Sequence, residues 1–185
     1  STWFDLQISL AHPTLRTFSG CTCPGTYHLK FGAIDYDKQQ IENAQNAAQE
    51  GNIAAVREFI AQHEVNINIV MNDGATLLFI AAEEGHLAVM TELIAAGADV
   101  NQATTTGATP LLVAAENGHH AAVTKLIAAG ALVDQALTTN GCTSLYIAAQ
   151  NGNLAVVTEL VTPIADVNKA MTTDGSTPLY IAAQK

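Results

Sequence analysis

Basic residues are scarce in this sequence. Its 185 residues hold only 7 Lys plus Arg against 17 Asp plus Glu, which gives a formal net charge of −10. Because proteins bind nucleic-acid phosphates and anionic lipid surfaces through clustered Lys and Arg, this balance argues against nucleic acid and membrane as main partners. It favours a partner that carries a basic patch.

Long apolar runs and a cysteine framework are also missing. No apolar stretch approaches the ~20 residues that span a bilayer, and no charged-then-apolar leader opens the chain. The 3 cysteines, Cys21, Cys23 and Cys142, are too few and too unevenly spaced for a disulfide scaffold. We therefore expect no membrane association and a reducing, cytoplasmic compartment, which would be the host cytosol for a secreted effector.

Aromatic residues are few, and they gather at one end. Six of the 10 (1 Trp, 4 Tyr, 5 Phe) lie before residue 37. In the same region STWFDLQISL and TYHLKFGAIDY alternate apolar and polar residues, as strands do. This composition predicts a separate unit over residues 1–38, a short β-rich or irregular extension.

This amino-terminal segment contains one candidate metal site, made of His12, Cys21, Cys23 and His28. Cys and His bind zinc tetrahedrally, and CTCPGTYH has the spacing C-x-C-x4-H. That spacing is similar to the post-SET tail of lysine methyltransferases, although the last ligand differs and nothing resembles a SET domain. We favour the alternative of partly buried thiols and surface histidines, and we expect no metal or other cofactor. A nucleophile and base pair of Cys21 with His28 has still less support, because no orienting group accompanies it.

The rest of the chain is a repeat. The stretch GATLLFIAAEEGHLAVMTELIAAGADVN begins at Gly74, returns in variant form at Gly107 and Gly141, and starts again at Gly175. The intervals are 107 − 74 = 33, 141 − 107 = 34 and 175 − 141 = 34 residues. Such a period is typical of stacked units that bury their apolar faces against one another.

Each unit opens with a stretch similar to T-P-L-H-x-A. The four stretches are TLLFIA from Thr76, TPLLVA from Thr109, TSLYIA from Thr143 and TPLYIA from Thr177. Together with the Gly-His pairs at 85–86 and 118–119 and the GADVN of 97–101, they resemble the ankyrin-repeat family. The resemblance implies an all-α solenoid of helix-turn-helix units with β-hairpin loops. It also implies a non-enzymatic scaffold for protein–protein interaction.

The repeat spacing predicts an ankyrin domain over residues 39–185. Its first helix is polar, as a terminal cap needs, because one side of a cap faces water. The parts are a cap at 39–72, repeats at 73–106, 107–140 and 141–174, and a partial repeat at 175–185. Because the chain starts at Ser1 rather than Met and stops inside a repeat, we expect a processed or excised product whose natural sequence continues beyond Lys185.

Local chemistry predicts how each unit folds. The opening threonine should cap its first helix, with Pro110 and Pro178 at the first helical position and glycine in the left-handed cap that follows. Val89, Met90 and Leu93 have helical spacing and should be core.

Two departures from the family pattern carry further predictions. At the position where many ankyrin repeats have His, this chain has Phe79, Leu112, Tyr146 or Tyr180, so we expect packing to replace an inter-repeat hydrogen bond. Pro163 should end the second helix of the third repeat early and distort the loop after it.

The resemblance also implies where a partner binds: hairpin tips and exposed first-helix positions, which together form a concave groove. The tip positions are Asn72 and Asp73, Thr104, Thr105 and Thr106, Thr138, Thr139 and Asn140, and Met171, Thr172, Thr173 and Asp174. The helix positions are Glu83, Glu84, Glu116, Asn117, Gln150 and Asn151. This threonine-rich groove with an acidic amino-terminal half suits a protein segment that is basic or hydroxyl-rich. In the alternative, these residues are solvated surface and the contacts lie elsewhere.

Two asparagines resemble the acceptors of asparagine hydroxylases that act on ankyrin domains. Asn101 and Asn168 each follow Asp-Val, with Leu93 and Leu160 eight residues before them. The alternative is a structural asparagine whose amide bonds the loop backbone.

No constellation in residues 39–185 resembles a catalytic site, so we expect no enzymatic activity from them. An alternative function is a recognition module of a larger enzyme, such as a secreted effector of an intracellular bacterium. Catalysis would then lie outside these residues.

Overall fold

The computed structural model describes residues 38–62, 66–161 and 165–184. The chain divides into two units, Ser1–Ala33 and Ile34–Lys185, and the following concerns the described residues of the second. The expected β-rich or irregular extension, the zinc candidates and the distortion at Pro163 lie outside the described residues.

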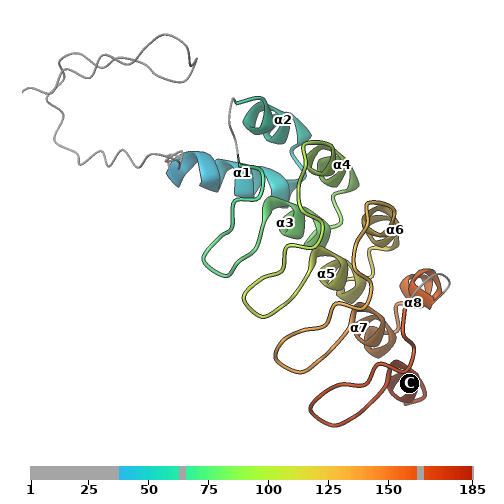
Figure 1. Cartoon of the computed structure of the whole chain (residues 1–185). Coiled ribbons are helices and arrows are strands. Elements are labelled where there is room, and N and C mark those ends of the chain that lie inside the picture. Colours follow the sequence, from blue (N-terminus) through green and yellow to red (C-terminus); the bar gives the residue numbers. More distant parts are fainter. Residues whose placement is uncertain (1–37, 63–65, 162–164, 185) are drawn as a thin grey trace, which may run out of the picture. The chain divides into compact units, whose positions relative to one another are not determined.

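The described residues fold into paired helices. The helices are α1 (Lys38–Glu50), α2 (Ile53–Ala61), α3 (Leu77–Glu83), α4 (Leu87–Ala95), α5 (Pro110–Glu116), α6 (His120–Ala128), α7 (Ser144–Asn151), α8 (Leu154–Val161) and α9 (Pro178–Ala182). The odd-numbered helices pack in one layer and the even-numbered helices in a second (Figure 1). A loop precedes each odd helix from α3 onward, and all these loops project to the same side (Figure 1). None of the described helices is long and apolar enough to cross a membrane.

The helix ends follow from the residues at the repeat boundaries. Thr76 accepts a hydrogen bond from the Phe79 amide at 3.2 Å, and the threonines that precede α5, α7 and α9 do the same. Such caps satisfy amides that have no partner within the helix. Pro110 and Pro178 occupy the first turn of α5 and α9. The predicted threonine caps and proline positions are confirmed.

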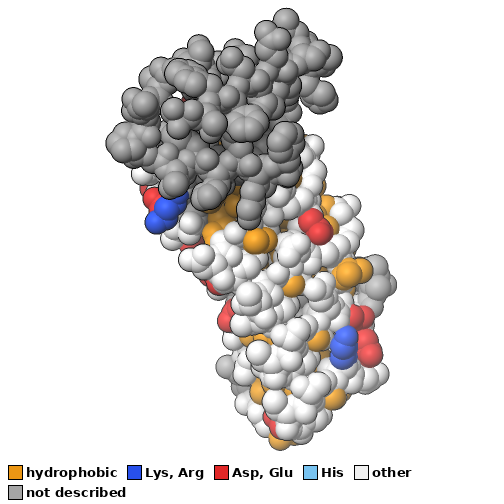
Figure 2. All heavy atoms as spheres, turned by 60° about the vertical axis from the view of Figure 1, so that its left-hand side comes forward, with side chains coloured by type: hydrophobic (Ala, Val, Ile, Leu, Met, Phe, Trp, Pro, Cys, Tyr) orange, Lys and Arg blue, Asp and Glu red, His pale blue; other side chains and the backbone are white. Residues whose placement is uncertain are grey.

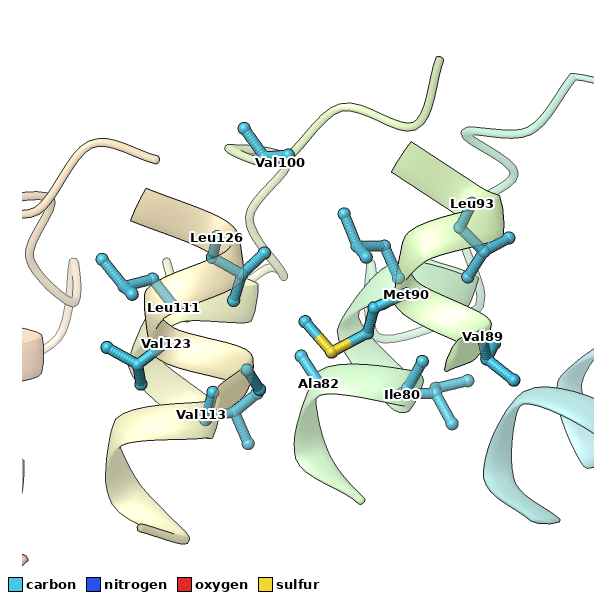
Figure 3. Packing of buried hydrophobic residues seen from close by; sticks show 14 of the residues in the cluster. Ile80, Ala82, Val89, Met90, Leu93, Val100, Leu111, Val113, Val123 and Leu126 are labelled. Atoms are coloured by element: carbon cyan, nitrogen blue, oxygen red, sulfur yellow. The ribbon is translucent and has the colours of Figure 1, made fainter. Parts of the chain in front are cut away.

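One hydrophobic cluster runs through the stack. Ala81 and Ala82 of α3 are fully buried, and their small side chains let neighbouring first helices approach. Val89, Met90 and Leu93 of α4 are also fully buried, as predicted. Ala82 and Met90 point toward the α5–α6 pair (Figure 3). The core therefore lies between units as much as within them.

The loops are closed by a few backbone hydrogen bonds. In the first, the Met71 amide donates to the Ala75 carbonyl and the Gly74 amide to the Met71 carbonyl, both at 2.9 Å. The expected β-hairpins are thus tight turns, and among the described residues one isolated bridge, Ala136 with Thr143, has β pairing. We call the spans 71–75, 104–108, 137–142 and 171–176 hairpin loops. The last two are one residue longer, which accounts for the 34-residue intervals.

Candidate functional site

The hairpin loops and the exposed carboxyl ends of α3, α5 and α7 form one side of the stack, here called the hairpin face. In Figure 2, which brings this side forward, neutral side chains and backbone dominate the described surface, with red acidic patches and few blue basic ones. At the amino-terminal end of this face, a cavity of about 240 Å³ lies between α1, the first hairpin loop and α3.

Threonines at the loop tips tie each hairpin loop to the one before it. Both the amide and the hydroxyl of Thr105 donate to the Asp73 carbonyl, at 2.9 and 3.0 Å. Thr138 donates to the Thr106 carbonyl in the same way, at 3.1 and 2.8 Å. Several tip residues predicted to contact a partner therefore also fix the geometry of the tips, a role that sequence reasoning missed.

Other predicted tip residues keep their side chains open. Thr139 and Thr173 are exposed and make no side-chain hydrogen bond within the described residues. Asp174 accepts from the amide and the hydroxyl of Ser176, at 3.0 and 2.7 Å. These two hydrogen bonds, the hydroxyl first, lower the pKa of Asp174. The last hairpin loop thus presents the Thr173 hydroxyl beside an ionised carboxylate, whereas the 137–142 loop has the neutral Asn140 at that position.

The carboxyl ends of the first helices are held by the following repeat. The Asn117 amide nitrogen donates to the Glu83 carbonyl at 2.9 Å, and Asn151 donates to the Glu116 carbonyl at 2.8 Å. His119 donates to the same Glu83 carbonyl at 2.9 Å. Two of the predicted groove positions are therefore occupied by inter-repeat bonds. The sequence did contain a signal for these bonds, because an Asn recurs three residues before the second helix in two successive repeats.

The acidic side chains near the cavity form no ion pair with a basic group among the described residues. Burial raises the pKa of Glu83, and the nearby charges of Glu84, Glu116 and Asp73 raise it further. The ion pairs found in the described part of the chain join Lys38 with Glu42, Arg57 with Glu92 and His120 with Glu159, and none involves these four acids. The amino-terminal half of the predicted groove is therefore acidic, and no described basic side chain neutralises it.

The prediction that packing alone replaces the inter-repeat hydrogen bond of histidine is wrong at Tyr146. Its hydroxyl lies 3.0 Å from the buried Ser176 hydroxyl of the next repeat. Because Ser176 donates its only proton to Asp174, Tyr146 is the donor in this pair. A tyrosine reaches far enough to restore an inter-repeat bond, which Leu112 at the same position in the preceding repeat cannot do.

Both the oxygen and the nitrogen of the Asn101 side-chain amide form hydrogen bonds to the backbone of the next repeat. Its Oδ1 accepts from the Leu132 amide at 2.8 Å and its Nδ2 donates to the Gly130 carbonyl at 3.2 Å. In contrast, the exposed Asn168 donates its backbone amide to Asp166 at 2.9 Å, and its side chain makes no hydrogen bond within the described residues. This geometry supports the structural alternative at Asn101. Hydroxylation of either residue stays a prediction.

Metal and thiol chemistry find no support in the part of the chain that the structure describes. No group of three or more His, Cys, Asp or Glu side chains there is placed to hold a metal ion. Burial, with a smaller contribution from Glu116, raises the pKa of the Cys142 thiol to about 11. A thiol with this pKa is almost entirely protonated at neutral pH and is a poor nucleophile.

Comparison with known proteins agrees with the geometry. A family profile described as ankyrin repeats in three copies matches residues 44–136 and 90–171. Human ankyrin repeat domain-containing protein 29 is 40% identical over 55 residues, which are 30% of this chain and 18% of that protein.

Fold and contacts together define a solenoid of stacked helical pairs, a class that generally serves protein–protein interaction and is typically non-catalytic. The chain belongs to the ankyrin-repeat family.

Proposed function

We propose that this chain is a non-enzymatic scaffold that binds a partner protein across its hairpin face. The observation that carries this proposal is the fixed geometry of the tips. Inter-repeat bonds such as Thr105 to Asp73 and Thr138 to Thr106 hold the loops in one arrangement. A surface that is ordered before binding loses less conformational entropy on association, so the same contacts yield higher affinity.

The two halves of the hairpin face suit different parts of one partner segment. Near α1 and α3 the face is acidic and forms no ion pair with the described basic residues, so it attracts a basic segment and repels an acidic one. Toward the carboxyl-terminal loops, Thr139 and Thr173 present free hydroxyls, which suit hydrogen-bonding side chains or backbone. An extended segment with basic residues at one end and polar residues at the other fits both halves.

Two further features of the function, its place in a larger protein and its cellular location, are also proposals. A recognition module of a larger enzyme, such as a secreted effector, would use the same face while catalysis lies outside the described residues. A cytoplasmic location, or the host cytosol for an effector, is likewise part of the proposal.

Affinity capture followed by mass spectrometry tests the proposal. The chain would be used as bait against lysate of its source cells, beside a tip variant with Thr139→Arg and Thr173→Arg. The matched control carries the same added charge on exposed positions of the second helices, Ala88→Arg and Ala155→Arg. We expect a set of captured proteins that the tip variant loses and the control retains. Equal capture by both variants, or loss only in the control, would move the interface away from the hairpin face.

A further inference from the structure

The cavity at the amino-terminal end of the hairpin face combines two kinds of lining. Met71, Phe79 and Ile80 supply apolar surface, and Asp73 and Glu83 supply carboxylates. At about 240 Å³ it is large enough for one long side chain and too small for a folded element. Figure 1 shows the elements that frame it, α1, the first hairpin loop and α3.

The carboxylates around this cavity repel one another. Glu84, Glu116 and Asp73 each raise the pKa of Glu83, in addition to burial. None of these acids is paired with a basic group among the described residues. Like charges held together without a counter-ion cost stability, and a cation that enters the cavity removes that cost.

The combination of adjacent acidic residues with a half-exposed aromatic ring is specific to the first full repeat. The positions of Glu83 and Glu84 carry Gln150 and Asn151 in the third repeat, and Asn151 there bonds the preceding helix end. The position of Phe79 carries Leu112 in the second repeat, where it is buried. Two adjacent acids beside a half-exposed aromatic ring therefore occur here and not at the equivalent positions of the next repeats.

We propose that this cavity binds the side chain of a single lysine or arginine from the partner segment. The methylene stem would lie against Met71 and Phe79, and the charged head would lie among the carboxylates of Glu83 and Asp73. An acidic or phosphorylated side chain is repelled, and a purely apolar one would desolvate the carboxylates without compensation. The assignment rests on the proposed function, because it names the chemistry of the partner at that site.

Small amino-acid probes test the cavity by itself. The ¹⁵N-labelled full chain would be titrated with Nα-acetyl-arginine methylamide and Nα-acetyl-lysine methylamide. Nα-acetyl-norleucine methylamide serves as the control probe, because it has an apolar stem without the charge. We expect saturable amide shifts at 71–75 and 79–84 with at least one basic probe, and about tenfold weaker binding of norleucine. Equal binding of norleucine, or shifts from both basic probes that neither saturate nor localise, would overturn the proposal.

Variants separate a local site from a diffuse acidic field. Glu83→Gln and Glu84→Asn introduce residues that the third repeat already carries at these positions, so the fold should accept them. We expect this double variant to weaken the favoured basic probe about tenfold, the amount that corresponds to losing one good charge contact. Phe79→Leu, which copies Leu112, should also weaken binding, because the stem loses its aromatic contact.

The control is Glu116→Gln, which removes one negative charge, against two in the double variant, one repeat further along and from a residue that does not line the cavity. A loss as large as that of the double variant would mean that the basic probe senses the overall field and that no side-chain subsite exists.

The two proposals can fail separately. Localised binding of the basic probe without any partner lost by the tip variant would contradict the scaffold and leave the cavity assignment standing. Capture that depends on the tips, with no localised binding of either basic probe, would support the scaffold and contradict the cavity assignment.

Discussion

Leu145 and Leu179 occupy the same position in consecutive repeats, yet Leu145 is 3% exposed and Leu179 is 75% exposed. The following residues differ in the same way, with Tyr146 at 5% and Tyr180 at 58%. α7 packs against α8 and α9, whereas α9 packs against α7 and has no second helix within the described residues. In this fold, therefore, burial is a property of the neighbouring unit rather than of the residue type.

Equivalent positions in different repeats thus form natural pairs of experiments. A solenoid's stability is approximately a sum of repeat terms and nearest-neighbour interface terms. One substitution made at two equivalent positions keeps the local chemistry constant and changes only the neighbour.

The largest effect is expected at the buried leucine. Leu111, at 1% exposure, belongs to the hydrophobic cluster that runs through the stack. Leu111→Ala should lower the free energy of unfolding by about 2–5 kcal/mol, because it removes buried methyl groups and leaves a cavity. Leu179→Ala should cost less than about 0.5 kcal/mol. Urea denaturation followed by circular dichroism measures both free energies of unfolding. A similar loss in the two variants would show that burial by the neighbouring unit does not determine the cost.

The second effect concerns glycines that end first helices. Gly85 and Gly152 have the same left-handed backbone, with φ of 73° and 75°. A Cβ at Gly85 would lie 2.7 Å from Nδ1 of His119, whereas a Cβ at Gly152 would have no neighbour within 4 Å among the described residues. Both alanine variants should lose about 1 kcal/mol from backbone strain, and Gly85→Ala should lose a further ~1 kcal/mol from the clash. Identical melting temperatures would show that His119 moves aside without cost.

A third pair isolates the inter-repeat hydrogen bond of tyrosine. Tyr146→Phe leaves the buried Ser176 hydroxyl without its donor and should cost about 1 kcal/mol. Tyr180→Phe at the exposed equivalent position should change stability by less than ~0.3 kcal/mol. Chemical denaturation of the two variants measures both costs. No loss of stability in Tyr146→Phe would mean that water replaces the hydrogen bond of the tyrosine.

Ser144 offers a stabilising change. Its side-chain oxygen is buried and has no hydrogen-bond partner in the described part of the chain, and the equivalent positions carry Pro110 and Pro178. Ser144→Pro should raise the free energy of unfolding by about 0.5–1 kcal/mol, because it restricts the unfolded chain and removes an unsatisfied hydroxyl. Ser144→Ala is the control, since it removes the hydroxyl without restricting the backbone. A melting temperature at or below that of the unchanged protein would contradict the prediction.

The smallest effect is the pH dependence of Glu83. Because folding raises its pKa, the folded state binds the proton more tightly and the ionised form opposes folding. Glu83→Gln should therefore stabilise at neutral pH by ~0.3 kcal/mol, the scale of a screened like-charge pair. The gain should disappear as the pH falls below the ordinary pKa of a glutamate. A gain that persists at low pH would have a cause other than charge.

The sequence predicts local features of this fold better than contacts between units. Thr76 and Pro110 act within one helical turn, so the residues around them suffice to predict the cap and the helix start. Thr105 and Asn117 bond atoms more than 30 residues away, and those bonds depend on how successive units stack. Sequence reasoning therefore placed these two residues correctly on the hairpin face and missed that part of their bonding capacity is used within the protein.

The candidate site shows the same limit. The family resemblance predicts an acidic groove at Glu83 and Glu84, but it does not predict the cavity beside them, because the cavity forms where the polar helix α1 meets α3. Its apolar lining, Met71 and Phe79, comes from a loop and a helix whose approach no single segment encodes.

Hydrogen–deuterium exchange on the complex with a captured partner tests most directly whether binding uses the hairpin face. We expect protection on binding at 71–75, 104–108, 137–142 and 171–176 and at the carboxyl ends of α3 and α5, with α4, α6 and α8 unchanged. Protection confined to α4, α6 and α8 would contradict the account.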